Sequence, residues 1–228
     1  MSARSPRHAV GLRERAGLPR RTGLVGAMVC GAAFVVLLIL VTLKWGPLAD
    51  LDRTAVAEMH TVALSHQWFV SIMKAVSAVG SPAVYAAVFA VVTAWLLLRR
   101  RVRAAAFVVV AVGVGLVLAP IVKRFVARPR PVLDSSVSHA GGYSFPSGHA
   151  LDVTVVLLVL LALCYPFLAG RARALAIVAA IVIALLMGLS RVVLGVHYPS
   201  DVAAGYALGC AWVGVALIAL RPGQRRAH

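Results

Sequence analysis

Acidic residues are scarce in this chain, and charged residues as a whole are uncommon. Among 228 residues only 7 are Asp or Glu, and Asp, Glu, Lys and Arg together make up 13%. Hydrophobic residues make up 61%, whereas a soluble domain has roughly 45–50%. We therefore expect an integral membrane protein rather than a soluble protein with a large core.

Cysteine is also rare, and its placement argues against two kinds of cross-link. Cys30, Cys164 and Cys210 each lie within an apolar run, where an isolated cysteine behaves as a small hydrophobic residue. The sequence has no CxxC pair and no Cys/His spacing of the kind that binds zinc. It therefore predicts neither a disulfide nor a structural zinc site.

Basic residues are frequent, and their positions matter more than their number. The chain has 23 Lys and Arg residues and a formal net charge of +16. Such a charge is typical of nucleic-acid binding, but the arginines lie at the ends of apolar runs, as membrane topology signals do. We therefore expect no nucleic-acid partner.

Apolar runs divide the chain into six candidate membrane spans, with no internal repeat and no second domain. They cover residues 24–45, 83–98, 104–125, 149–168, 174–196 and 202–220, each near the ~20 residues that a bilayer core requires. A basic tail followed by an apolar run can also be a signal peptide. The length of the first run and the absence of a cleavage site favour a retained helix.

The expected fold is all-α, a six-transmembrane-helix bundle with an amphipathic helix between spans one and two. That helix is placed in residues 50–80, which mix charged and apolar residues at helical spacing and are too polar to span. Residues 1–22 are expected to be a disordered basic cytoplasmic tail. Residues 23–220 are expected to form the membrane domain, and residues 221–228 a cytoplasmic C-terminal tail.

The distribution of positive charge predicts the orientation of the bundle. If both termini are cytoplasmic, 15 of the 23 Lys and Arg residues lie inside, as the positive-inside rule requires. Charges held on the outer side against this rule invite a functional explanation. They are Lys44, Arg53, Lys74, Lys123, Arg124, Arg128, Arg130 and Arg191, and the last five cluster at the outer ends of spans three and five.

Three polar stretches fall at the outer ends of spans in this topology, and together they suit an anion. They are "KRFVARPRP" at 123–131, "PSGH" at 146–149 and "SRVVLGVHYPSD" at 190–201. Lys123, Arg130 and Arg191 could hold a dianionic phosphate, because guanidinium groups match phosphoryl oxygens. "PSGH" opens a helix with Ser147 or Gly148 as N-cap, and a helix N-terminus attracts anions.

The same stretches contain a nucleophile and an acid of the kind that phosphoryl transfer needs. A histidine whose one ring nitrogen faces a carboxylate has a fixed tautomer and a free second nitrogen. His197 and Asp201 have that spacing, and His149 could protonate a leaving oxygen. "YPSD" is also typical of a helix start, with Ser200 as the expected N-cap and Asp201 in the first turn of span six.

Other interpretations of these residues remain open from the sequence. A single arginine at the end of a membrane helix commonly does no more than extend its charged head to the membrane–water interface. His197 and Asp201 could form half of a metal site, although nearby cations would repel a divalent ion. Asp152 could serve only to cap or solvate the mouth of span four. His60, His66 and His139 have no motif context.

Taken together, the three stretches resemble the type 2 phosphatidic acid phosphatase family, which shares its site with vanadium haloperoxidases and glucose-6-phosphatase. The family pattern runs K-x6-RP, then PSGH, then SR-x5-H-x3-D. Lys123 with Arg130 and Pro131, residues 146–149, and Ser190, Arg191, His197 and Asp201 match it at every position. The resemblance covers roughly residues 51–220.

The resemblance implies an activity and a set of roles. His197 would form a phosphohistidine, Asp201 would orient it, and His149 would protonate the leaving oxygen. The phosphoryl group would be bound by Lys123, Arg130, Ser147, Gly148 and Arg191. Such enzymes work without a metal ion or other cofactor. Arg128 lies outside the pattern and could contact a second phosphate or the lipid headgroup region.

The function expected from these observations is hydrolysis of the terminal phosphate of a membrane lipid on the extracytoplasmic face. Phosphatidic acid, phosphatidylglycerol phosphate and polyprenyl diphosphate all present a suitable terminal group. A phosphotransferase and a phosphatase of non-lipid phosphomonoesters would use the same site. A soluble haloperoxidase fits six spans poorly. A transporter or channel with an anion-binding mouth would need ionisable residues in the span centres, where they are almost absent.

Overall fold

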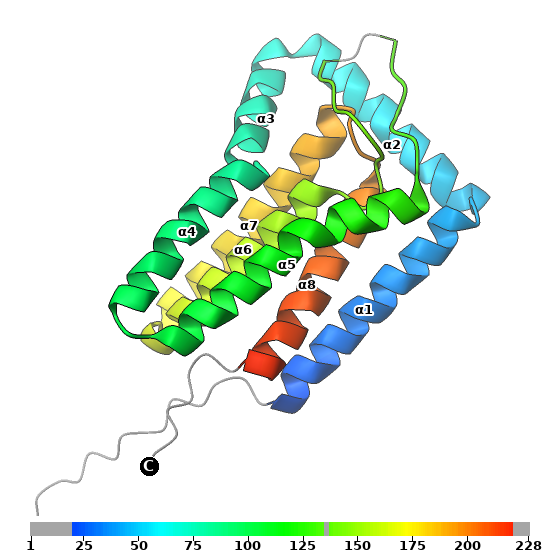
Figure 1. Ribbon diagram of the computed structural model, residues 1–228. Coiled ribbons are helices and arrows are strands. Elements are labelled where there is room, and N and C mark those ends of the chain that lie inside the picture. Colours follow the sequence, from blue (N-terminus) through cyan, green and yellow to red (C-terminus); the bar gives the residue numbers. More distant parts are fainter. Residues whose placement is uncertain (1–19, 135–136, 221–228) are drawn as a thin grey trace, which may run out of the picture.

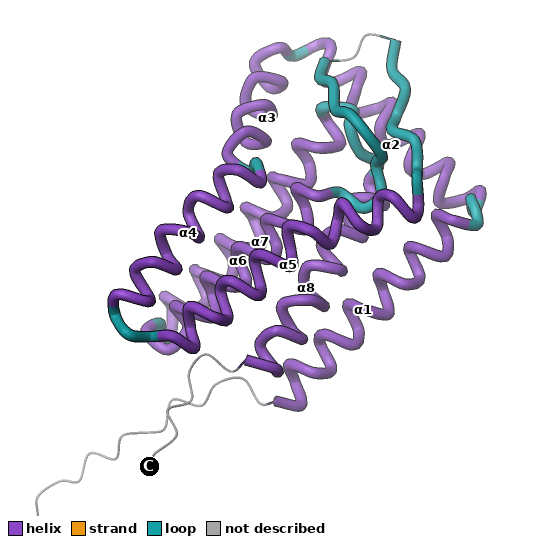
Figure 2. Tube along the Cα trace, in the orientation of Figure 1, coloured by secondary structure: helices purple, strands orange, loops and turns teal. Residues whose placement is uncertain are grey.

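Helices account for all the regular structure in the part of the chain that the structure describes, residues 20–134 and 137–220. The computed structural model is shown in Figures 1 and 2. The all-α fold class is confirmed. The elements are α1 (Arg20–Thr42), α2 (Gly46–Ser65), α3 (Gln67–Val79), α4 (Pro82–Leu98), α5 (Val102–Val126), α6 (Gly148–Cys164), η1 (Tyr165–Phe167), α7 (Gly170–Val193) and α8 (Pro199–Leu220).

Five helical segments are long and apolar enough to cross a membrane by themselves: α1, α5, α6 with η1, α7 and α8. A sixth span requires α3 and α4 together, a pair bent by 41° at Gly80 and Ser81. The second predicted span, residues 83–98, coincides with α4, which has 17 residues. The bundle therefore has five or six candidate spans, in agreement with the expected fold.

The polar segment between the first two spans differs in detail from the prediction of one amphipathic helix. It forms two helices, α2 and α3, separated at His66. Figure 1 shows α2 lying obliquely across one end of the bundle, while α3 descends along its side and leads into α4. Asp52, Val56 and Ala63 are the buried residues of α2, so this helix packs on the bundle with a charged residue on its inner face.

The helix α8 packs most extensively against α1 and α6, and glycines set the close approach to α6. A Cβ atom on Gly205 would lie 2.6 Å from the carbonyl oxygen of Ser147. One on Gly209, four residues later, would lie 2.9 Å from Cβ of Thr154. Small residues at this spacing let two membrane helices approach closely, and here they hold the start of α6 against α8.

The two ends of the bundle carry different parts of the chain. The described chain ends, Arg20 and Leu220, lie at the same end as the α4–α5 loop and η1 in Figure 1. The long loop between α5 and α6 and the α7–α8 turn lie at the opposite end, where α2 also lies (Figure 1). Helix α1 begins at Arg20, so it includes three residues assigned above to the tail. Residues 1–19 and 221–228 of the two predicted tails lie outside the described residues.

Candidate active site

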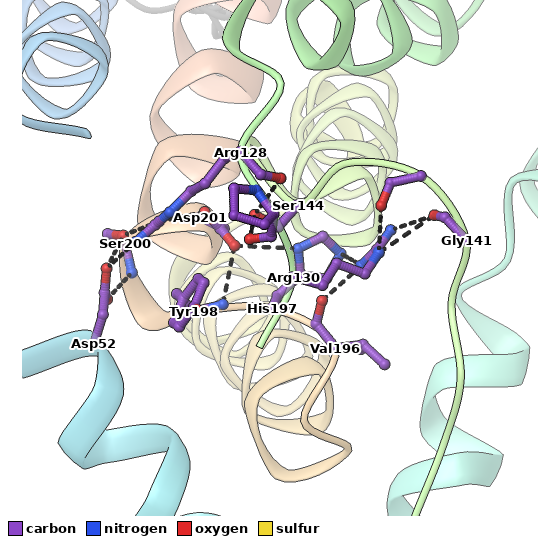
Figure 3. A network of polar contacts seen from close by, with 12 residues as sticks. Asp52, Arg128, Arg130, Gly141, Ser144, Val196, His197, Tyr198, Ser200 and Asp201 are labelled. Atoms are coloured by element: carbon purple, nitrogen blue, oxygen red, sulfur yellow. Dashed lines mark hydrogen bonds and ion pairs between the residues drawn. The ribbon is translucent and has the colours of Figure 1, made fainter. Parts of the chain in front are cut away.

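The residues predicted to act together do meet, at the end of the bundle opposite Arg20 and Leu220. Six chain segments position them. Lys123 lies in the last turn of α5, Arg130 follows in the loop, and residues 147–149 start α6. Arg191 lies in the last turn of α7, His197 in the α7–α8 turn, and Asp201 in the first turn of α8. Figure 3 shows part of this assembly from close by.

The start of α6 has the form expected for an anion-binding helix end. Ser147 occupies the N-cap position and its side chain makes no capping hydrogen bond. Its backbone N–H donates to the carbonyl oxygen of Asp201 at 2.9 Å, which ties the start of α6 to α8. The hydroxyl of Ser147 is fully buried and has no hydrogen-bond partner among the described residues. It remains available to a ligand.

Backbone hydrogen bonds in the α7–α8 turn hold His197 close to Arg191. The backbone N–H groups of Val196 and His197 both donate to the carbonyl oxygen of Arg191, at 3.2 and 3.3 Å. Gly195 adopts a φ of +69°, and a Cβ atom there would lie 2.3 Å from Leu133. Because a side chain would be both strained and blocked at this position, the turn depends on glycine.

The start of α8 fixes Asp201, and it corrects one expectation. The helix begins at Pro199, so Ser200 lies within the first turn and is not the N-cap. Proline suits the first helical position because its missing N–H would have no partner there. The Oδ2 atom of Asp201 accepts a hydrogen bond from the backbone N–H of Tyr198 at 2.9 Å. This is the return bond of a capping box, and it aims the carboxylate toward the turn that carries His197.

His197 lies between a carboxylate and a cation. Its Nδ1 is 3.5 Å from Oδ2 of Asp201, and its Nε2 is 3.2 Å from Nη1 of Arg130. Because a guanidinium can only donate, Nε2 accepts and the ring proton of the neutral imidazole is on Nδ1, facing Asp201. The Nδ1···Oδ2 distance exceeds the ~2.7–3.2 Å of an ordinary hydrogen bond, and Nδ1 has no hydrogen-bond partner among the described residues.

Burial keeps His197 neutral. The residue is 2% exposed, and this burial, with the cations Arg130 and Lys123 acting in the same direction, lowers its pKa to about 4 against the opposing effect of Asp201. A neutral imidazole with its proton on Nδ1 has a lone pair on Nε2. His197 therefore has the ionisation state and the tautomer that a nucleophile requires.

Arg130 is anchored by backbone carbonyls rather than by an acid. It donates to the carbonyl oxygen of Val196 at 2.6 Å and to that of Gly141 at 2.9 Å, with a further bond to Gly142 at 3.1 Å. These bonds hold the guanidinium beside the Nε2 edge of the His197 ring, as Figure 3 shows. No carboxylate neutralises it in these contacts, so its positive charge is available to an anion.

Arg191 and His149 both interact with Ser77, a residue that no sequence motif indicates. Nη1 of Arg191 donates to the hydroxyl of Ser77 in α3, and His149, half-buried at the start of α6, interacts with the backbone of Ser77. Arg191 is 7% exposed, and its Nε has no hydrogen-bond partner among the described residues. Ser77 lies in a plain amphipathic segment without a motif, so no local pattern could have indicated it.

Two further features bear on the alternatives left open above. No group of three or more His, Cys, Asp or Glu residues in the described part of the chain could hold a metal ion, and the His197–Asp201 pair has Arg128 and Arg130 as neighbours. Arg128 donates to Asp52 and Asp201, so its guanidinium is engaged by carboxylates and not free for a second phosphate. Asp52 was not predicted to belong to the site.

Comparison with known proteins identifies related chains. The family model described as the PAP2 superfamily matches residues 104–224. Phosphatidylglycerophosphatase B of Bacillus subtilis is 30% identical over 151 residues, which cover 65% of this chain and 73% of that protein. Decaprenylphosphoryl-5-phosphoribose phosphatase of Mycobacterium tuberculosis is 40% identical over 114 residues, covering 49% of this chain and 58% of that protein.

A solved structure has the same fold. It is the crystal structure of the first transmembrane PAP2 type phosphatidylglycerolphosphate phosphatase from Bacillus subtilis, with a TM-score of 0.77 and 22% sequence identity. The match covers 89% of this chain and 99% of that one. It extends well beyond the residues of the family model, so the helices before residue 104 also have counterparts in that structure.

Proposed function

The chain belongs to the PAP2 superfamily, and on that premise we propose that it is a membrane phosphatase that removes the terminal phosphate of a lipid phosphate or diphosphate. His197 attacks the phosphorus and carries the phosphate as a phosphohistidine. Asp201 and His149 assist as orienting carboxylate and proton donor. The reaction needs no metal ion, because cationic side chains and a helix N-terminus stabilise the phosphoryl charge.

The observation that carries this proposal is a buried set of unpartnered donors beside a neutral imidazole. The hydroxyl of Ser147 and the Nε of Arg191 are buried and have no hydrogen-bond partner among the described residues. A buried donor without a partner costs free energy, commonly about 1–3 kcal/mol. A phosphoryl group bound between them would satisfy both donors and would lie close to the Nε2 of His197.

The first half of the reaction follows from the tautomer of His197. The lone pair of Nε2 attacks the phosphorus, so an Nε2–P bond forms while the P–O bond to the leaving group breaks. His149 gives its proton to the departing oxygen. The imidazole gains positive charge, and Asp201, facing Nδ1 at 3.5 Å, balances it. Arg130, now 3.2 Å from Nε2, is positioned to transfer its hydrogen bond to a phosphoryl oxygen.

The second half returns the enzyme to its starting state. His149, now neutral, takes a proton from a water molecule that attacks the phosphorus on the side the leaving group has vacated. The Nε2–P bond breaks, inorganic phosphate leaves, and His149 is protonated again for the next cycle. Lys123, Arg130, Arg191, Ser147 and the N–H of Gly148 hold the three equatorial oxygens through both steps.

The position of the site at one end of the bundle suits a lipid substrate. A headgroup phosphate could reach the start of α6 while its tails remain in the bilayer. The two named relatives carry the names of different lipid phosphates, which agrees with a motif that binds the phosphate and not the tail. We place the site on the extracytoplasmic face, with six spans and both termini inside, from the distribution of arginines.

Phosphate release from detergent-dispersed lipid phosphates tests the proposal. The panel is phosphatidic acid, phosphatidylglycerol phosphate and a polyprenyl diphosphate, each assayed with and without chelator. We expect turnover of at least one lipid, unaffected by chelator, inhibited by vanadate and lost in His197→Ala. Activity that requires added magnesium would support the metal half-site, and release only from water-soluble phosphates would point to a non-lipid substrate.

A further inference from the structure

Arg128 and Asp52 form a cluster with the catalytic carboxylate, and neither belongs to the family pattern. Nη1 of Arg128 donates to Oδ1 of Asp201 at 2.6 Å, and Nη2 donates to Oδ2 of Asp52 at 2.7 Å. One guanidinium therefore bridges two carboxylates that come from α8 and α2. Figure 3 shows Arg128 lying between them.

Ser200 closes this cluster from the third side. Its backbone N–H donates to Oδ1 of Asp52 at 3.0 Å, and its hydroxyl donates to Oδ2 of the same carboxylate. Nη1 of Arg128 also donates to the Ser200 hydroxyl at 2.8 Å. Asp52 thus receives three hydrogen bonds and holds both Arg128 and the first turn of α8.

The cluster is far more buried than a surface ion pair. The side chains of Asp52 and Asp201 are 1% and 0% exposed, and that of Arg128 is 14% exposed. The guanidinium also lies over the ring of Tyr198, 4.2 Å from the ring centroid. Charge-assisted hydrogen bonds in such a place are strong and geometrically defined, so the orientation of the Asp201 carboxylate is determined on both of its oxygens.

We propose that Arg128 and Asp52 are positioning residues for the His197–Asp201 pair, and that Arg128 is not a phosphate ligand. Arg128 holds Oδ1 of Asp201, which leaves Oδ2 facing Nδ1 of His197. Asp52 holds Arg128 in turn, through its own carboxylate and through Ser200. The relay runs from α2, a helix outside the residues of the family match, to the nucleophile. This inference rests on the proposed function, since positioning matters only if His197 reacts.

Conservative substitutions separate this role from phosphate binding. Arg128→Lys keeps the charge but has one nitrogen, which cannot bridge two carboxylates as a guanidinium does. Asp52→Asn keeps the shape but loses the charge. We expect each to lower kcat by about 10- to 100-fold, with KM and the vanadate inhibition constant changed less than about threefold. The double variant should lose little more than the worse single variant, because both act through one contact.

Matched controls are available on the same two segments. Arg124→Lys and Asp50→Asn change the same residue types at exposed positions, and neither residue contacts the cluster. Both controls should keep native kcat and KM. If KM and the vanadate constant rise in Arg128→Lys while kcat is retained, Arg128 is a phosphate ligand and the proposal is wrong. Native kcat in both Arg128→Lys and Asp52→Asn would also overturn it.

A purely structural role is tested in the same samples. The active fraction is counted from the burst of phosphoenzyme, and kcat is expressed per active molecule, so a loss that disappears on this correction contradicts the proposal. If Asp52→Asn does not fold, Ser200→Ala serves instead. It keeps both charges, removes one bridging hydroxyl and should lower kcat by a few-fold with KM unchanged.

A readout without turnover distinguishes failure of this inference from failure of the proposed function. Nitrogen NMR of the His197 ring reports which nitrogen carries the proton. The native protein should have the proton on Nδ1, and Asp52→Asn should show a larger share of the Nε2–H tautomer. If Asp52→Asn has the native tautomer and the native kcat, the positioning role is refuted. If the native protein is inactive on every phosphate but Asp52→Asn still shifts the tautomer, only the proposed function is refuted.

Discussion

At the scale of single residues, the ionisation of His197 decides whether the site can react. Burial lowers its pKa to about 4, against an ordinary value of 6.5. Between these values the folded protein holds the ring neutral, while an unfolded chain would protonate it. The stability linked to this group is therefore complete above pH 6.5 and is lost as the pH falls from 6.5 toward 4.

This linkage predicts a titration that can be measured directly. In detergent, the ring carbon resonance of His197 should still report the neutral form at pH 5.5 and should titrate near pH 4. The resonance is assigned by its absence in His197→Ala. NMR is preferred to a pH–rate profile because the second ionisation of the substrate phosphate, near pH 6, would overlap. A midpoint at 6.5 or above would contradict a buried, neutral nucleophile.

The residues that could be predicted from the sequence are those whose chemistry and spacing are visible locally. His197 and Asp201 are four residues apart at a helix start, and "PSGH" marks the start of α6. Asp52 and Ser77 could not be predicted in this way, since their partners Ser200 and Arg191 are 148 and 114 positions away. Only the folded chain brings those pairs together.

At the scale of elements, the contact between α6 and α8 positions the phosphate-binding helix end. Gly205 lies against the carbonyl oxygen of Ser147, which is backbone and cannot move aside as a side chain could. The sequence predicted both helices, but not that the glycines of "GYALG" would set their spacing. The sequence also predicted Ser200 as the N-cap of α8, whereas the helix begins at Pro199, since proline suits the first helical position.

Gly205→Ala therefore tests how closely the two helices must approach. The added methyl group would push the start of α6 away, and a displacement of about 1 Å at a reacting centre can cost up to ~100-fold in rate. We expect kcat to fall at least about 10-fold and the Tm in detergent to fall. Gly113→Ala is the matched control, because a Cβ atom at Gly113 in α5 meets nothing within 4 Å. Equal effects of the two substitutions would contradict this role for the α6–α8 contact.

At the scale of the whole molecule, the arginines of the site and the arginines of the α4–α5 loop lie at opposite ends of the bundle. Arg99 to Arg101 lie in the α4–α5 loop, at the same end as Arg20 and Leu220, whereas Arg130 and Arg191 lie at the other end (Figure 1). This arrangement agrees with a cytoplasmic end rich in topology signals and an opposite end where cations are retained for binding. The charge rule could predict such a separation, since it requires only the order of spans and loops.

Accessibility labelling tests the sidedness. In a variant with Cys30, Cys164 and Cys210 replaced by alanine, a cysteine is introduced at Val132, which is 94% exposed at the end that carries the site. A second variant carries it at Arg101. An impermeant maleimide should label Val132→Cys in intact cells and Arg101→Cys only after permeabilisation. The opposite pattern would place the site in the cytoplasm and would refute the proposed face of action.

The central claim is that His197 carries the phosphate between the two halves of the reaction, and trapping that intermediate tests it most directly. The native protein is mixed briefly with a lipid whose terminal phosphate is radioactive, denatured in alkali and digested. We predict a label that survives alkali, is lost in acid, and maps by mass spectrometry to His197, with no label in His197→Ala. Label on another residue, or full turnover by His197→Ala, would contradict the account.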